Sequence, residues 1–136
     1  MNQTEITVRT EGFCHVEDIT AEAGRFVSGS EECQGLLNLF VPGSTAGLTT
    51  IEFEPGAVED LRQAMERMAP QGIHYNHDAR WGDGNGFSHV RAALLGPSLT
   101  IPFRDNHLLL GTWQQVVLVD FDNGPRDRRV ILTLSL

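Results

Sequence analysis

The sequence predicts an α+β fold: a β-rich, mostly antiparallel sandwich of two sheets with two or three helices, in a single domain that spans residues 1–136. Three observations predict it. Segments with strand patterns outnumber those with helical patterns, and tight turns separate several neighbouring strands. The length is that of one domain. No internal repeat or low-complexity linker divides the chain.

Alternating or short apolar segments predict the strands. Ile6 and Val8 alternate with polar neighbours over residues 4–8, as in a half-buried strand. Further strand patterns cover residues 13–16, 35–41, 46–53, 98–103, 108–110, 113–121 and 130–136. The sequence Asp-Asn-Gly-Pro at 122–125 is a strong turn signal, so it separates the last two strands.

Capping and periodicity predict the helices. Thr20 is the expected N-cap of a helix over residues 21–27. Pro55 begins the clearest helix, which has one apolar face and ends before Pro70.

A third, short helix is expected near the middle of the chain. Ser88 or Asn85 is its expected cap, and it runs to about Leu95. The preceding residues, 71–86, are rich in Gly, Asp, Asn and His and are expected to be irregular.

Composition excludes several classes of function. The formal net charge is −8, which disfavours nucleic-acid binding. All ten basic residues are arginine, which excludes a Schiff-base or P-loop lysine. No apolar run reaches the roughly 20 residues that span a bilayer. The polar N-terminus lacks a signal pattern and there are only two cysteines, so a cytoplasmic protein without membrane contact is expected.

The segment 71–89 carries the most concentrated polar chemistry. If His77 and His89 converge with Asp78 or Asp83, two imidazoles and a carboxylate would suit zinc or another divalent ion. The same groups would also serve as acid and base. The alternative is a solvated loop whose histidines cap helices and turns, and the spacing matches no general metal motif.

Two other segments suggest anion binding. Ser44 and Thr45 stand beside Gly43, where exposed backbone N–H groups can hold an anion, although an ordinary turn has the same composition. Arg126 and Arg128 can clamp a phosphate or carboxylate bidentately. The alternative for the arginines is a charged rim facing solvent or another subunit.

Four further residues are candidates that depend on the fold. Trp113 can stack on a flat ring while Gln114 orients it, or the pair can simply occupy a core and an edge position. Glu52 and Asp60 are ordinary surface carboxylates unless they face the histidines, where they would complete a metal shell or move protons.

Three segments, residues 39–61, 75–103 and 108–130, together resemble the YjbQ-like family, often labelled secondary thiamine-phosphate synthase. The residues that match the family's motifs are Ser44, Thr45, Ala46, Glu52, Asp60, Tyr75, His77, Asp78, Ser88, His89, Gly111, Thr112, Trp113, Gln114, Arg126 and Arg128. The resemblance implies a homotrimer with clefts between subunits. It also implies weak synthesis of thiamine phosphate from hydroxymethylpyrimidine diphosphate and thiazole phosphate.

The resulting interpretation is a metal-dependent enzyme acting on a small phosphorylated metabolite. In it, His77 and His89 hold a divalent metal, with zinc favoured. The expected catalytic residues are Glu52, Asp60 and Asp78, and the expected ligand-binding residues are Ser44, Thr45, Trp113, Gln114, Arg126 and Arg128. The alternatives are a binding module for a small anionic ligand, without turnover, and a structural trimer.

One departure bears on the metal. Gly43 stands where the family usually has the histidine of a His-Thr-Thr-Ala segment. If that histidine is a ligand in relatives, this chain has lost one. His74 or His107 would have to replace it, or the site would hold metal weakly or bind only an anion.

Overall fold

Two antiparallel β-sheets and four helices make up the computed structural model, which describes residues 2–136. This confirms the predicted fold class. The elements are β1 (Gln3–Thr10), β2 (His15–Asp18), α1 (Thr20–Ser28), β3 (Gln34–Phe40), β4 (Ala46–Ile51), α2 (Pro55–Met68), α3 (Asn76–Trp81), α4 (Gly86–Leu95), β5 (Ser98–Arg104), β6 (His107–Leu108), β7 (Gln115–Asp120) and β8 (Arg126–Ser135). Among the helices of residues 2–136, none has both the length and the apolar character needed to cross a bilayer.

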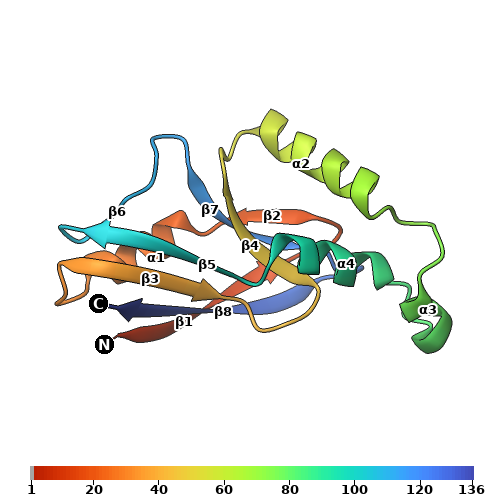
Figure 1. Ribbon diagram of the computed structural model, residues 1–136, viewed down its shortest axis with the longest axis horizontal. Helices are drawn as coiled ribbons and strands as arrows, with labels where there is room; N and C mark the ends of the chain where they lie inside the picture. The colour runs from red at the N-terminus through yellow and green to blue at the C-terminus, as the bar shows by residue number, and fades with distance from the viewer. Residues whose placement is uncertain (1) are drawn as a thin grey trace.

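The strand order places the ends of distant segments together. The larger sheet has the order β1-β8-β3-β5-β6, and the smaller one β2-β7-β4. In the smaller sheet, Asp120 at the end of β7 lies opposite both His15 and Ala46. In the larger sheet, Thr10 at the end of β1 lies opposite Arg126 at the start of β8. Figure 1 shows both chain termini together at one end of the sandwich and α3 at the other.

Strand β7 is the centre of the molecule because both of its faces are buried. Val116 and Leu118 pack with the larger sheet and α1 in one core. Val117, Val119 and Phe121 pack with α2 and α4 in a second core. Figure 1 shows α2 on the side of β4 and β7 that faces away from β1, β3 and β8. Burial on both faces explains why this strand reads as a continuous apolar run rather than an alternating one.

The start of α1 differs from the prediction. Ile19, not Thr20, is the N-cap, and Thr20 is the first helical residue. The Thr20 hydroxyl donates to Asp18 Oδ1 at 2.6 Å and accepts from the backbone N–H of Val116 at 2.8 Å. The Asp18 carboxylate also accepts the Thr20 N–H at 2.9 Å. The hydroxyl therefore joins the helix to β7 instead of capping it.

The segment expected to be irregular contains a helix, α3. It has only six residues, too few to show an apolar period. Helix α4 begins at the predicted place, and Asn85, one of the two expected caps, is its N-cap residue, although its side chain makes no capping hydrogen bond. The Asn85 side chain donates to Asp122 Oδ1 at 3.2 Å, and the Ser88 hydroxyl donates to the Asn85 carbonyl at 2.6 Å. A tertiary contact thus engages the Asn85 side chain, while Ser88 is not the cap.

The last two strands are shifted from their predicted positions. Strand β7 begins at Gln115, which leaves Trp113 and Gln114 in the preceding turn rather than in a strand. Strand β8 begins at Arg126 instead of Val130, so both site arginines lie on a strand. The reason is that β8 pairs with β1 along the whole length of β1, which extends the strand through its polar half.

We predict that Leu118→Ala lowers the free energy of unfolding by about 2–5 kcal/mol, because it opens a cavity in a fully buried position of β7. Leu94→Ala is the matched control, since Leu94 is 59% exposed on α4 and its loss should change stability by less than about 0.5 kcal/mol. Urea denaturation of both variants measures the difference. Equal losses would contradict the two-core packing.

Candidate functional site

A hollow of about 460 Å³ opens at the end of the sandwich that carries α3. It lies where α3, α4, the turn before β4 and the start of β8 meet. Seven candidate residues from the sequence line it: Ser44, Thr45, His77, Asp83, His89, Arg126 and Arg128. The fold therefore brings the histidine segment, the small-residue turn and the arginine cluster to one place.

The two imidazoles of this hollow lie against each other. The ring centroids of His77 and His89 are 4.4 Å apart, with the planes tilted by 40°. His77 comes from α3 and His89 from the first turn of α4. The two helices approach closely because Gly86 begins α4, where a Cβ would lie 2.6 Å from Cβ of Tyr75. A glycine at this position thus allows the two rings to meet.

Asp78 orients this pair. Its Oδ1 lies 3.2 Å from His77 Nδ1 and accepts the backbone N–H of Gly86 at 2.8 Å. Burial raises the pKa of the Asp78 carboxyl, but hydrogen bonds from His77 and Gly86 outweigh burial and lower the pKa overall. An ionised Asp78 favours the His77 tautomer that carries its proton on Nδ1, which leaves Nε2 with a free lone pair.

Arg128 is held beneath the hollow by a buried carboxylate. Its Nε donates to Asp120 Oδ2 at 2.7 Å, and its Nη2 donates to Asp120 Oδ1 at 2.9 Å and to Thr45 Oγ1 at 2.6 Å. The Thr10 hydroxyl also donates to Asp120. Burial raises the pKa of Asp120, but the hydrogen bonds from Arg128 and Thr10 and the charge of Arg128 hold it below its ordinary value.

Asp122 holds the second arginine. Its Oδ2 accepts from Arg126 Nε at 2.7 Å and from the Thr45 hydroxyl at 3.0 Å, while Oδ1 accepts from Asn85 at 3.2 Å. Burial raises the pKa of Asp122, and hydrogen bonds from the Asn123 backbone, Asn85 and Thr45 lower it further than burial raises it. The Arg126 side chain itself is 54% exposed, so the rest of its guanidinium is open to solvent.

Asp120 and Asp122 are the residues that sequence reasoning missed. The sequence predicts only a turn at Asp122 and an apolar strand at Asp120. The available signal was the burial expected for that strand, since a carboxylate inside an apolar run needs a hydrogen-bonded partner. The arginines one and three residues beyond the turn, Arg126 and Arg128, supply those partners.

The other predicted residues lie elsewhere in the chain. Glu52 and Trp113 line a second hollow of about 390 Å³, and Trp113 is 71% exposed there. Thr45 precedes β4 and Glu52 follows it, so roughly 20 Å of strand separates the two hollows. Within one chain, Glu52 and Trp113 therefore do not meet the histidines.

Asp60 and Gln114 also lie away from the histidine hollow. Asp60 is exposed on α2. The Gln114 side chain stabilises the turn before β7. Its Oε1 accepts the Gly111 N–H at 3.0 Å, and its Nε2 donates to Thr50 Oγ1 at 2.9 Å. Of the three predicted catalytic carboxylates, only Asp78 contacts a histidine of the hollow.

The side chains of one chain do not complete a zinc site. Across residues 2–136, no three His, Cys, Asp or Glu side chains converge in a way that would hold a metal ion. His74 and His107, the two candidates to replace a histidine at position 43, do not line the hollow. His74 Nε2 lies 3.3 Å from Asn76 Oδ1, and His107 Nδ1 lies 2.6 Å from the Asp105 carbonyl oxygen. Structural and catalytic zinc sites ordinarily use three or four protein ligands, and this hollow offers two imidazoles.

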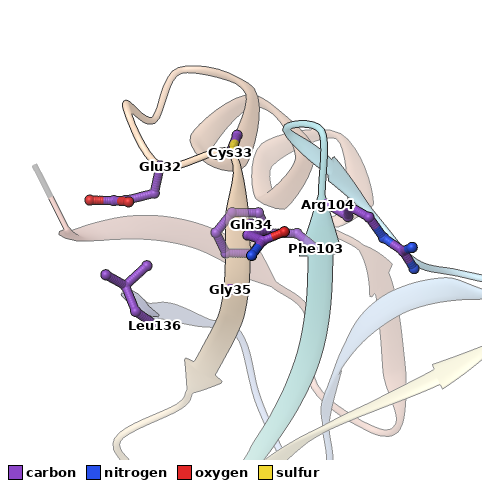
Figure 2. Close-up of a pocket in the computed structure, with 7 residues that line it drawn as sticks. All are labelled: Glu32, Cys33, Gln34, Gly35, Phe103, Arg104 and Leu136. Carbon is purple, nitrogen blue, oxygen red and sulfur yellow. The ribbon is translucent and has the colours of Figure 1, made fainter.

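A larger hollow, of about 580 Å³, lies near the C-terminus and lacks comparable chemistry. Figure 2 shows its two charged side chains, Glu32 and Arg104, on opposite sides of β3 and β5 and pointing apart. A ligand site needs polar groups that converge. Size alone therefore does not make this hollow the candidate site.

The sequence matches a known protein family over almost its whole length. The model of the family "UPF0047 protein YjbQ-like" covers residues 4–135. A UPF0047 protein from Archaeoglobus fulgidus is 39% identical over 128 residues, which make up 94% of this chain and 97% of the relative. The protein YugU of Bacillus subtilis, of the same family, is 31% identical over 112 residues, 82% of each chain.

Solved structures show the same fold. A YbjQ-like protein of unknown function from Sulfolobus solfataricus superposes with a TM-score of 0.92 at 28% identity, covering 97% of this chain and 94% of the other. A hypothetical protein from Aeropyrum pernix superposes with a TM-score of 0.91 at 32% identity, covering 99% and 98%. These comparisons establish the family and the fold, and they name no activity.

We predict that Asp120→Asn lowers the free energy of unfolding by about 3–5 kcal/mol, because it leaves the buried Arg128 guanidinium without its counter-charge. The control is Asp127→Asn on β8, the strand that carries Arg128. The partner of Asp127, Arg9, is exposed, so the effect should stay below about 1 kcal/mol. Chemical denaturation at pH 7 measures both. A loss in Asp120→Asn no larger than in the control would show that the buried pair is not needed.

Acid should weaken the fold through the same carboxylates. The pKa values of Asp120 and Asp122 are lowered in the folded protein, so their contribution is complete above the ordinary carboxyl pKa of about 4. That contribution is lost as the pH falls from about 4 through the lower folded-state pKa values. Denaturation curves between pH 7 and pH 2 should show this decline in the native protein and a shallower one in Asp120→Asn. Equal pH dependence in the two would contradict the assignment.

Proposed function

The chain belongs to the UPF0047 protein YjbQ-like family, and from its site we propose an enzyme that acts on a small phosphorylated metabolite bound in the hollow that His77 and His89 line. One observation carries the proposal: two guanidinium groups and a pair of imidazoles line the same hollow. Guanidinium groups bind phosphate oxygens through several N–H donors. An imidazole is the side chain best suited to move a proton near neutral pH.

In this proposal, Arg126 and Arg128 bind the phosphate group. Arg128 is fixed in orientation by Asp120, and Arg126 is fixed at Nε by Asp122. A donor that is already held in place loses less conformational entropy when the ligand binds. The Ser44 side chain, in the turn across the hollow, adds a hydroxyl.

In this proposal, the imidazoles of His77 and His89 transfer the proton. Asp78 occupies Nδ1 of His77, and His89 stands beside the ring at 4.4 Å between centroids. In this arrangement Asp78 is a positioning residue, and the imidazoles donate or accept the proton.

The reaction we propose is a group transfer that releases pyrophosphate, following the family resemblance. In weak synthesis of thiamine phosphate, the ring nitrogen of thiazole phosphate attacks the methylene carbon of hydroxymethylpyrimidine diphosphate. The bond from that carbon to oxygen breaks, and pyrophosphate leaves with its electron pair. The arginines would hold the departing pyrophosphate, and an imidazole would give it a proton.

A homotrimer would bring the predicted residues of the two hollows together in one site. Glu52 and Trp113 lie at the opposite end of β4 from the histidine hollow, so a site using all the predicted residues has to be shared between copies. We propose that the second hollow of one copy faces the histidine hollow of the next. Glu52, Trp113, Asp60 and Gln114 would then act across the subunit boundary.

Zinc at His77 and His89 stays a prediction. Two imidazoles of one chain are an incomplete site, so a further ligand would have to come from water or from another copy. Metal analysis of freshly purified protein, before and after His77→Ala, tests for such an ion.

Two other functions use the same residues. A binding module would hold the anion without turnover, which the lack of a third converging metal ligand in residues 2–136 favours. A structural trimer would use the polar loop to stabilise an interface. The same set of variants distinguishes all three.

We predict that His77→Ala and His89→Ala keep the fold and lower product formation about 100-fold or more, the usual effect of losing an acid–base group. His107→Ala, an exposed histidine outside the hollow, is the control and should keep full activity. The assay incubates protein with the pyrimidine diphosphate and the thiazole phosphate, with and without divalent metal, and measures product by chromatography.

Each alternative has its own outcome. A ligand-induced rise in melting temperature without product, over many enzyme equivalents, would indicate the binding module. Dissociation of both histidine variants into monomers on a sizing column would indicate the structural trimer. No product and no melting shift in the native protein would contradict the proposal.

A further inference from the structure

Arg128 has one nitrogen that the protein leaves unused. Its Nε and Nη2 are bonded to Asp120 and Thr45, but its Nη1 donates no hydrogen bond within residues 2–136. The side chain is only 8% exposed, and it lines the hollow. Because Arg128 lines the hollow, an anion bound there can accept a hydrogen bond from this N–H₂ group.

Gly43 is the residue that leaves this nitrogen open. A Cβ at position 43 would lie 3.1 Å from Arg128 Nη1 and would have no other neighbour within 4 Å. Its φ of +144° is also a conformation that L-residues with a side chain rarely adopt. The positive φ favours glycine here, and the Cβ of any other residue would press against Nη1.

Arg126 lies two residues before Arg128 on β8, so both side chains lie on the same face of the strand and line the hollow. A tetrahedral oxyanion has oxygens in several directions and can accept from both guanidinium groups at once, whereas a flat carboxylate has only two. The two guanidinium groups together therefore fit a terminal phosphate better than a carboxylate.

We propose that Gly43 determines the specificity of the hollow: it exposes Arg128 Nη1, which binds one oxygen of a terminal phosphate group while Arg126 binds another. This inference rests on the proposed function and names the contact that the phosphorylated substrate makes. It also explains how a chain without a third metal ligand at this place holds an anionic ligand directly.

Asp83 provides an independent electrostatic test. Two carboxylates line the hollow, and Asp122 is bonded to Arg126, whereas the side chain of Asp83 takes part in no hydrogen bond within residues 2–136. A free carboxylate beside a phosphate repels it. Its removal should therefore strengthen binding without touching the buried network.

The experiment measures the affinity of the full-length protein for inorganic phosphate by titration calorimetry. Gly43→Ala should bind phosphate roughly ten- to a hundredfold more weakly, the effect of losing a charge-assisted hydrogen bond. Gly72→Ala is the matched control, because Gly72 also has a positive φ, of +79°, but a Cβ there meets nothing within 4 Å. Asp83→Asn should bind a few-fold more tightly.

A second measurement needs no variant. In native protein labelled with ¹⁵N-arginine, phosphate should shift the Nη1 resonance of Arg128, which keeps the inference testable even if Gly43→Ala does not fold. Phosphate binding that is equal in Gly43→Ala and native protein, with no shift at Arg128, would overturn the inference and leave the proposed function standing. Absence of phosphate binding to the native protein would also overturn it, and the product assay would then decide the proposed function separately.

Discussion

The buried pair of Asp120 and Arg128 is the interaction on which the rest of the structure depends. Asp120 belongs to the smaller sheet and Arg128 to the larger one, so their two hydrogen bonds join the layers of the sandwich. The Thr10 hydroxyl donates a further hydrogen bond to Asp120, and the Thr45 hydroxyl accepts one from Arg128. Two charges removed from water are tolerated in a core only when they are paired and hydrogen-bonded. The pair also fixes the guanidinium that faces the hollow.

This arrangement places chemistry at one end of the sandwich. The apolar part of β7 is occupied by two cores, and its polar end, at Asp120 and the following Asp122, organises the arginines. Helices α3 and α4 carry His77 and His89, which line the same hollow. Strand β8 thus holds the guanidinium groups, while short helices hold the imidazoles.

Much of this site could be predicted from the sequence because its residues are chemically conspicuous. Histidines, arginines and a small-residue turn stand out from apolar surroundings, and His77, His89, Arg126 and Arg128 do line one hollow. Asp120 could not be singled out, since its role appears only when its partner strand is known. Glu52 could not be placed either, because its distance from the histidines depends on the direction of β4.

The sequence by itself determined the two-sheet α+β architecture, the strand and helix types and the polar segments, because alternation, capping and turn chemistry are local properties of the chain. Only the tertiary structure decided where β8 begins, that α3 exists, and which predicted residues meet. Pairing with β1 draws the arginines into a strand, and packing of α3 against Gly86 brings the imidazoles together. Contacts between distant residues fix these features, and no local pattern encodes them.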